Sequence, residues 1–263
     1  NHVGRSSALF AQAASSPDNP YRGWFYFNDQ FSRGVRLWAN APSLPELNYE
    51  NPAVCDYIYG APDSVIRSYL RLGIDGWRLD TAFELGFNYL WELTNSAHAE
   101  KAGSLVVGEI WNYPADWFPA LDSVMNFTLR QIILDSLKGK TGPALAGNMI
   151  AQMIADAGIE EMLKSWIVLD NHDVPRINAT LPDPRDQKIA QVLQFTLPGS
   201  PNLYYGNELG MQGGGDPSNR APMRWDLVTA ENEVYRWMKT LIQLRKGQRA
   251  LKIGDYRQLL SSE

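Results

Sequence analysis

The stretches GWRLD (76–80), LVVGE (105–109) and WIVLDNHD (166–173) each carry an acidic residue at or just after a short apolar run. Runs of Val, Ile, Leu and Trp bounded by Gly or Pro are typical of buried strands. A (β/α) barrel builds its catalytic centre from side chains at the carboxyl ends of several strands. Burying several acids together is costly unless chemistry needs them, so these acids are candidate catalytic residues. They are Asp80, Glu109 and Asp173.

The bulk composition indicates an ordinary globular chain. Its 263 residues are 20% charged and 44% hydrophobic, enough for one large α/β domain. A net charge of −5 argues against nucleic acid and anionic membranes as partners, and no apolar run approaches a transmembrane length. The single cysteine, Cys55, excludes an internal disulfide framework and is expected to be a packed thiol. Three histidines argue against a His-rich metal site.

The organisation of the chain changes near residue 60. Residues 3–60 are rich in Pro, Asn, Gly and aromatic residues and predict a long irregular excursion, which inside a compact domain is usually functional. Beyond it, strands and helices alternate, which predicts a parallel α/β sheet. The expected strands are 76–80, 105–109, 124–127, 166–170 and 202–205. The expected helices are one through 66–70 with Asp63 as cap and Gly73 at its end, then 83–101, 129–137, 187–195 and 233–246.

Two of the acids stand in different surroundings. Alternation along a strand points Arg78 and Asp80 the same way, and a neighbouring guanidinium keeps a carboxylate ionised. Such an Asp suits a nucleophile, although a structural salt bridge would have the same pattern. Glu109 is flanked by apolar residues, which favour the protonated form expected of a general acid. The alternative for Glu109 is a helix cap at the end of a strand.

The turn with His172 and Asp173 offers hydrogen bonds to sugar hydroxyls, although Asn and Asp also favour turns for local reasons. An ionised acid and a protonated acid on one rim meet the requirement for glycoside hydrolysis. Adjacent strands would hold the two carboxyl groups roughly 5 to 6 Å apart, which favours a retaining mechanism through a covalent intermediate.

Several motifs together resemble one family, the α-amylase superfamily (glycoside hydrolase family 13). GWRLDTA, VVGEIW and LDNHD resemble its second, third and fourth signature regions, and Asn1-His2 resembles the end of the first. LPELN (44–48) resembles the extra region in domain B, and PGSPNLYYGNELGM (198–211) resembles the region at the eighth strand. LPELNYENP and GMQGGGDP look most like the neopullulanase, cyclomaltodextrinase and maltogenic amylase branch.

The resemblance implies roles for individual residues. Asp80 would be the nucleophile, Glu109 the general acid/base, and Asp173 the third acid, which holds the sugar in the transition state. The residues that would bind the substrate are Arg78, His172 and His2 at the cleavage site, Asp216 and Arg220 at the next sugar, and Trp111 along the cleft.

The resemblance implies no organic cofactor and leaves calcium in question. Glu84 stands where many α-amylases carry a His whose main chain helps to hold calcium. This departure argues against a calcium site of the family type, for which Asn1 is the remaining weak candidate ligand.

The chain also departs from the family in extent. The expected fold is a partial TIM (β/α)8 barrel, about strands 4–8 with their helices, because five strands are recognisable where the barrel needs eight. We expect a fragment in three parts: residues 1–60 are the end of strand 3 and the domain-B-like excursion, 61–250 the barrel portion, and 251–263 the truncated start of a C-terminal β domain. Members of the resembled branch often dimerise through an N-terminal domain, so a homodimer through regions outside this chain is expected.

The function expected from this resemblance is that of a retaining hydrolase, which cleaves α-1,4 and, as a further option, α-1,6 glucosidic bonds. Its expected substrates are starch, maltooligosaccharides or cyclodextrins, so the expected partner is an α-glucan. Two alternatives remain open. One is a transglycosylase or trehalose-forming relative, since water and sugar compete for the same intermediate. The other is a non-catalytic glucan-binding subunit, because fold alone does not determine function. Linkage preference, oligomeric state and compartment do not follow from the sequence.

Overall fold

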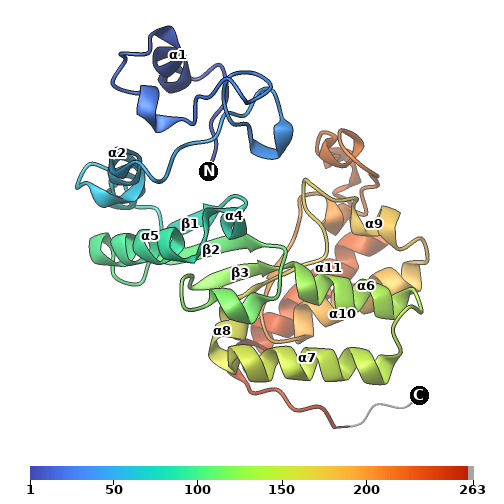
Figure 1. Cartoon of the computed structure of the whole chain (residues 1–263). Helices are drawn as coiled ribbons and strands as arrows, with labels where there is room; N and C mark the ends of the chain where they lie inside the picture. The colour runs from blue at the N-terminus through green and yellow to red at the C-terminus, as the bar shows by residue number, and fades with distance from the viewer. Residues whose placement is uncertain (260–263) are drawn as a thin grey trace. The chain divides into compact units, whose positions relative to one another are not determined.

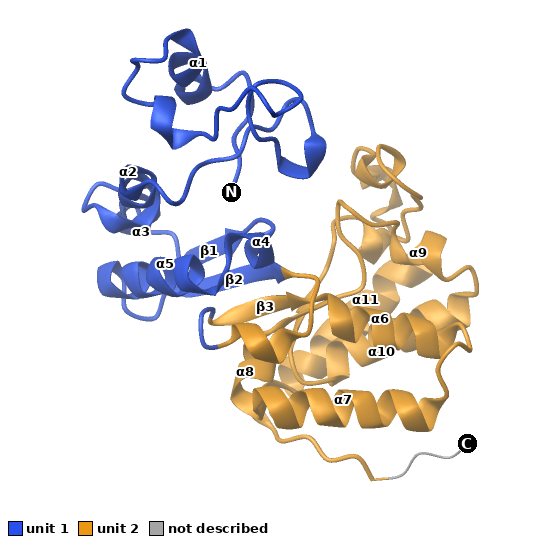
Figure 2. Ribbon diagram, viewed as in Figure 1, with its two compact units in different colours: residues 1–109, 119–121 blue, residues 110–118, 122–263 orange. Residues whose placement is uncertain are grey.

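The computed structural model describes residues 1–259 (Figure 1). The chain forms two compact units (Figure 2). Unit 1 comprises Asn1–Glu109 and Pro119–Leu121, and unit 2 comprises Ile110–Phe118 and Asp122–Glu263. The Asp80 and Glu109 carboxylates therefore belong to unit 1, and Asp173 belongs to unit 2.

The first part of unit 1 is an irregular segment with a small core of its own. Helix α1 (Ala8–Ser15) begins at Ser7, whose hydroxyl accepts a hydrogen bond from Phe10 N at 3.3 Å. Short helical turns follow at η1 (Arg22–Trp24), η2 (Trp38–Asn40), α2 (Pro52–Cys55) and η3 (Asp56–Gly60). The buried residues of this core are Phe10, Ala13, Phe25, Val35, Leu47 and Val54. The predicted excursion is thus a packed segment, stabilised by burial of aromatic and aliphatic side chains.

The rest of unit 1 is a strand–helix–strand arrangement. Helix α3 (Val65–Arg71) leads to β1 (Gly76–Leu79), then α4 (Ala82–Leu85), α5 (Phe87–Glu100) and β2 (Leu105–Ile110). The two strands are parallel, in the register Gly76↔Leu105 to Leu79↔Gly108. Helices α3 and α5 pack together, and Leu90 and Leu93 of α5 are buried. Parallel strands with a helical crossover are what the alternating pattern predicted.

Glycine is required at the start of β1 because the backbone of β2 lies against it. A Cβ atom built on Gly76 would stand 2.0 Å from the carbonyl oxygen of Leu105 and 2.8 Å from its nitrogen. Neither atom can move without breaking the register of the two strands. Gly76 therefore fixes how closely β1 and β2 approach, and with it the relative position of Asp80 and Glu109.

Unit 2 continues the alternation. Its strands are β3 (Ser123–Asn126), β4 (Trp166–Val168) and β5 (Ser200–Asn202), paired in parallel through Met125↔Trp166 and Trp166↔Ser200. Its helices are α6 (Phe127–Leu137), α7 (Pro143–Ala157), α8 (Ile159–Lys164), α9 (Ile177–Thr180), α10 (Pro184–Thr196), α11 (Glu233–Gly247) and α12 (Ala250–Ile253). Short 3-10 turns are η4 (Pro114–Trp117), η5 (Asn207–Leu209), η6 (Ser218–Arg220) and η7 (Trp225–Leu227).

Side-chain caps set the helix starts in unit 2. Asn126 accepts a hydrogen bond from Leu129 N at 2.8 Å, so α6 begins two residues before the predicted start. Asp183 caps α10 by accepting a hydrogen bond from Arg185 N, and Asn232 caps α11 by accepting hydrogen bonds from Val234 N and Tyr235 N. The core between sheet and helices contains large, fully buried side chains, among them Leu129, Ile133, Met153, Ile167 and Leu169.

Some predicted elements were wrong in detail. The helix expected over 83–101 is two helices, because Gly86 has a φ of +89° and separates α4 from α5. The N-cap residue of α3 is Ser64 and not Asp63. The strand predicted over 202–205 lies earlier, as β5 at Ser200–Asn202. The helices that were not predicted are α1, α2, α7, α8, α9 and α12. In the predicted C-terminal β segment, α12 ends at Ile253, residues 254–259 form no strand, and 260–263 lie outside the described residues.

Among residues 1–259, no helix combines the length and apolar character needed to cross a bilayer.

We predict that Gly76→Ala lowers the free energy of unfolding of the full-length protein by about 1 to 3 kcal/mol or more, because the added methyl group collides with backbone atoms of β2. Chemical denaturation monitored by fluorescence would measure it. The matched control is Gly247→Ala at the end of α11, where a Cβ meets nothing within 4 Å and stability should change little or rise. Equal stability of both variants would contradict the close strand approach.

Candidate active site

Two of the candidate acids lie at the same end of neighbouring strands in unit 1. Leu79 is paired with Gly108 in the parallel register, so Asp80 and Glu109 each stand one position further along. Asp80 directly follows the last residue of β1, whereas Glu109 lies inside β2. The predicted placement of these two acids on one rim is confirmed within this unit.

Arg78 contacts both carboxylates. Its Nη1 donates a hydrogen bond to Asp80 Oδ1 at 2.6 Å, and its Nη2 lies 3.1 Å from Glu109 Oε2. The contact with Asp80 satisfies hydrogen-bond geometry, whereas Nη2 makes a charge contact without an aligned hydrogen bond. The predicted pairing of Arg78 with Asp80 is confirmed. Sequence reasoning missed that the same guanidinium also reaches Glu109, so the surroundings of Glu109 are not purely apolar.

The three acids differ in exposure. The Glu109 side chain is 3% exposed, whereas Asp80 is 51% and Asp173 is 37% exposed. The expectation that all three acids are buried was therefore wrong for Asp80 and Asp173. Glu109 is the one acid of the three that the fold encloses.

Thr81 is a functional candidate that sequence reasoning missed. It has a left-handed backbone with φ of +39°, an uncommon conformation for a β-branched residue. In this conformation its N–H donates to Glu109 Oε2 at 2.9 Å, and its hydroxyl donates to Asn1 Oδ1 at 3.2 Å. Backbone strain of this kind persists where surrounding contacts hold it and is frequent at functional sites. Its position directly after Asp80 is the only signal that the sequence offered.

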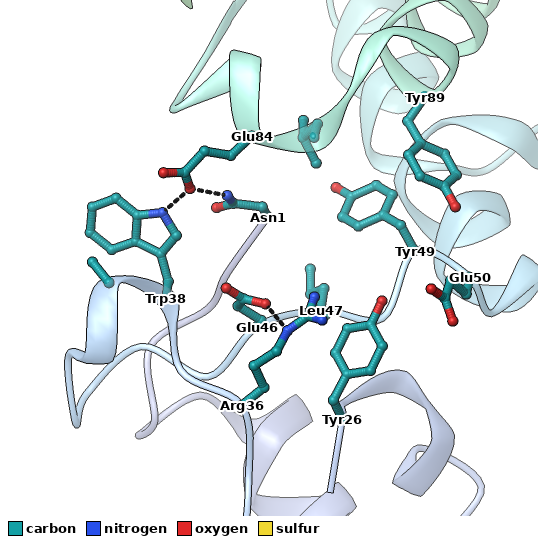
Figure 3. A pocket seen from close by; sticks show the side chains of 12 residues that line it. Asn1, Tyr26, Arg36, Trp38, Glu46, Leu47, Tyr49, Glu50, Glu84 and Tyr89 are labelled. Atoms are coloured by element: carbon teal, nitrogen blue, oxygen red, sulfur yellow. Dashed lines mark hydrogen bonds and ion pairs between the residues drawn. The ribbon is translucent and has the colours of Figure 1, made fainter. Parts of the chain in front are cut away.

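His2 lies beside Asp80 and next to a network around Glu84. Figure 3 shows the Glu84 carboxylate between Asn1 and Trp38. His2 Nε2 lies 3.9 Å from Asp80 Oδ2, and its Nδ1 lies 2.6 Å from Asn1 Oδ1. Glu84 Oε2 accepts hydrogen bonds from Asn1 Nδ2 at 3.0 Å and from the indole N–H of Trp38. Trp38 also stacks on the His2 ring, with centroids 4.8 Å apart. Glu84 therefore joins α4 to the irregular N-terminal segment.

Burial lowers the pKa of His2, although the nearby carboxylates of Asp80, Glu84 and Glu46 act in the opposite direction. A lowered pKa favours a neutral imidazole at neutral pH. Such a ring offers one donor and one acceptor, which suits hydrogen bonding to a hydroxyl group.

The candidate calcium ligand Asn1 does not fit that role in this arrangement. Its main-chain oxygen accepts a hydrogen bond from Leu47 N at 2.9 Å, and its side-chain oxygen is engaged by His2 and Thr81. Within residues 1–259 no group of three or more His, Cys, Asp or Glu side chains is arranged to hold a metal ion.

Asp173 belongs to a second cluster, in unit 2. Its Oδ1 accepts a hydrogen bond from Arg220 Nη2 at 3.0 Å, and its Oδ2 lies 3.2 Å from His172 Nε2. Arg220 Nε lies 3.6 Å from Asp216 Oδ2. Four predicted residues thus form one polar group. Buried Asn219 supports it by donating to the carbonyl oxygens of His172 and Val174, at 2.9 and 3.1 Å.

Trp111 is also in unit 2. It stacks on Phe127 with centroids 3.9 Å apart and an angle of 11° between the planes, and it is 43% exposed. The indole is therefore fixed in orientation while part of its surface stays accessible.

Asp170 anchors the turn that carries His172 and Asp173, and sequence reasoning gave it no role. The carboxylate is 1% exposed. It accepts hydrogen bonds from Ile177 N at 2.6 Å and from Asn207 Nδ2 at 2.5 Å. Burial raises the pKa of Asp170, while these hydrogen bonds and the positive charges of Arg176 and Arg130 act in the opposite direction. The turn is thus tied at its base to the loop after β5.

Comparison with known proteins gives the class. Residues 1–231 match the model of the alpha amylase catalytic domain, and the chain belongs to this family. The chain is 29% identical to a cyclomaltodextrinase from a Bacillus species, over 100% of this chain and 49% of that protein. It is 30% identical to neopullulanase 2 from Thermoactinomyces vulgaris, over 98% of this chain and 45% of that protein. The predicted family is confirmed.

The solved structures agree. The chain matches a cyclic α-maltosyl-(1→6)-maltose hydrolase from Arthrobacter globiformis with a TM-score of 0.90 at 25% identity, covering 97% of this chain and 59% of that one. A cyclomaltodextrinase structure matches with a TM-score of 0.86 at 29% identity, over 96% and 45% of the two chains. The predicted partial (β/α)8 barrel is thereby confirmed. The chain spans about half the length of the curated relatives it matches.

We predict that Asp170→Ala lowers the free energy of unfolding by about 3 to 5 kcal/mol, because it leaves two buried hydrogen-bond donors without their acceptor and removes the negative charge that acts on the buried Arg176. Urea unfolding would measure this change. Asp116→Ala is the matched control, because Asp116 is exposed on η4 and its loss should cost less than about 0.5 kcal/mol. Similar losses in both variants would mean that Asp170 does not anchor the turn.

Proposed function

We propose that this chain provides the catalytic acids of a retaining glycoside hydrolase that cleaves α-1,4 glucosidic bonds, and also α-1,6 bonds, in α-glucans. The observation that carries the proposal is the pair Asp80 and Glu109 at the carboxyl ends of adjacent parallel strands, with the guanidinium of Arg78 touching both. Two carboxyl groups serving as nucleophile and acid are the requirement for this chemistry.

The contacts of the two acids support different roles for them. Asp80 receives the aligned hydrogen bond from Arg78 and is half exposed, so its carboxyl group is oriented and open to an incoming anomeric carbon. Glu109 is enclosed by the strand and oriented by the Thr81 N–H. A carboxyl group shielded from water suits the part that must hold and return a proton.

The proposed reaction has two steps. Glu109 protonates the glycosidic oxygen while a carboxylate oxygen of Asp80 attacks the anomeric carbon, so that the bond to the leaving sugar breaks and a β-glycosyl ester forms. Glu109, now a carboxylate, then takes a proton from water, which attacks the ester carbon and releases Asp80. Two inversions give net retention.

Asp173 is proposed to accept hydrogen bonds from the 2- and 3-hydroxyls of the sugar, contacts that strengthen as the ring flattens. Support for this role comes from the Arg220 and His172 contacts, which orient its carboxylate. Arg78, His2 and His172 would bind the sugar at the cleavage site, Asp216 and Arg220 the next sugar, and Trp111 would line the cleft. The mechanism uses no organic cofactor, and no step depends on calcium.

The names of the relatives support α-glucans as the substrate class. They include cyclomaltodextrinases, a neopullulanase and an intracellular maltogenic amylase from Bacillus subtilis, which is 27% identical over 95% of this chain. These names refer to cyclomaltodextrins, pullulan and maltose. We propose the same class for the full-length protein, with water as the usual acceptor.

We predict that Glu109→Gln in the full-length protein lowers kcat on maltotriose and soluble starch by about 100- to 10,000-fold, because an amide cannot deliver a proton to the leaving oxygen. Reducing-sugar release would measure the rate. Glu160→Gln, on the exposed surface of α8, is the matched control and should keep the wild-type rate. If Glu109→Gln kept near-normal turnover, Glu109 would not be the general acid. If the wild-type protein bound maltotriose without cleaving it, the protein would be a non-catalytic glucan-binding protein.

We also predict that the first product released from a maltooligosaccharide has the α configuration, because attack by Asp80 followed by water inverts the anomeric carbon twice. Proton NMR recorded during the first minutes, before mutarotation, distinguishes the two anomers. An initial β product would mean that Asp80 activates water instead of forming an ester. Larger products than the starting maltotriose would show that sugar, and not water, is the main acceptor.

A further inference from the structure

We propose that a cavity in unit 2 between α9, α10 and the start of α11 is a second carbohydrate-binding site, which takes a glucosyl unit of an α-glucan. The cavity has a volume of about 530 Å³, within the range of about 300 to 1,000 Å³ usual for small-ligand pockets. None of the proposed active-site residues lines it. Its lining includes Asn178 from α9, Gln187 and Gln191 from α10, Gln212 from the loop after η5, and Trp237 from α11.

Two buried polar atoms of the cavity lining lack hydrogen-bond partners among the described residues. Asn178 is 5% exposed, and its Oδ1 accepts nothing, while its Nδ2 donates to Met211 O at 3.2 Å. Trp237 Nε1 is also buried and has no acceptor. Most buried polar groups in proteins are paired, and an unpaired one is energetically unfavourable. Two residues that line the cavity therefore carry unpaired groups: Asn178 has an acceptor that needs a donor, and Trp237 has a donor that needs an acceptor.

A sugar hydroxyl meets both needs, because it donates one hydrogen bond and accepts others. The remaining polar lining is mostly amide, from Gln187, Gln191 and Gln212, and amides likewise both donate and accept. Lys188 and Glu233 are the charged residues of the lining, and their charges cancel. This balance favours a neutral polyhydroxyl ligand over a phosphate or a metal ion.

The Trp237 indole adds an apolar surface against which the C–H face of a sugar ring can pack. The indole is partly buried against the cluster of Phe195, Met238 and Leu241, so its orientation is fixed. Lys188 Nζ lies 5.8 Å from the ring centroid. An indole held in one orientation beside amide side chains is a pre-organised binding surface, and pre-organisation lowers the entropic cost of binding.

The identity of the sugar as an α-glucan rests on the proposed function. A glucan is a long chain, so a site outside the acid clusters would hold a distant part of the same polymer. Loss of the site should then raise the KM for starch while leaving the kcat and KM for maltotriose near their wild-type values.

The test uses the full-length protein with Glu109→Gln, labelled with 5-fluorotryptophan and observed by ¹⁹F NMR during titration with maltotriose. Trp237→Phe identifies the Trp237 signal among those of the nine tryptophans. We expect this signal to move saturably with maltotriose but not with β-linked cellotriose. Gln212→Ala should weaken this binding by about three- to tenfold, the effect of one hydrogen bond. Gln131→Ala, an exposed glutamine on α6, is the matched control and should leave the binding unchanged.

If the wild-type protein cleaves starch but the ¹⁹F chemical shift of Trp237 does not change during the titration, the second site is overturned. The cavity would then hold water only. Equal shifts with maltotriose and cellotriose would overturn the α-glucan assignment. Because the titration needs no turnover, a wild-type protein without activity but with a saturable, maltotriose-specific shift would refute the proposed function and support the second site.

Discussion

The guanidinium of Arg78 stands between two carboxylates, and the geometry of the candidate active site follows from that contact. Asp80 is 2.6 Å from one of its nitrogens and Glu109 is 3.1 Å from another. A flexible lysine could not make both contacts in fixed directions, whereas a planar guanidinium can. The arrangement needs β1 and β2 at close spacing, which the missing side chain of Gly76 permits. Strand packing and chemistry are therefore linked in this unit: the same register that buries Val106 and Val107 also aligns the two acids.

Polar contacts outside the acids hold the catalytic groups in place, and each unit uses its own set. In unit 1, Thr81 orients Glu109 through its N–H. Glu84 fixes Asn1 and Trp38 (Figure 3), and these two residues contact His2. In unit 2, Asp170 ties down the turn that carries His172 and Asp173. Reactive side chains on rigid supports need less reorganisation during the reaction. Glu84 is of particular interest because one oxygen of its carboxylate accepts hydrogen bonds from both Asn1 and Trp38.

Much of this architecture could be predicted from the sequence, and the limits have physical causes. The five strands, the parallel pairing within each unit and six of the twelve α-helices among residues 1–259 follow from short apolar runs, glycines and periodicity. The motifs are dense enough to identify the family. Errors occurred where local signals conflict. Gly86 interrupts a pattern that otherwise reads as one helix, and α7 begins with Pro143 in a stretch whose alanines and glycine weaken its periodicity. The roles of Thr81 and Asp170 were missed because both depend on contacts with residues distant in the sequence.

The sequence by itself identified the candidate catalytic residues, because the identity of a carboxylate or an arginine and its place after a strand follow from the order of the residues. It also determined the family and the alternation of strands and helices. Only the tertiary structure decided that Arg78 serves both acids, that Glu109 is enclosed while Asp80 and Asp173 are open to solvent, and that Asn178 and Trp237 leave unpaired polar atoms in one cavity. Burial and pairing depend on which distant segments come together, and this is a property of packing that no local sequence pattern specifies.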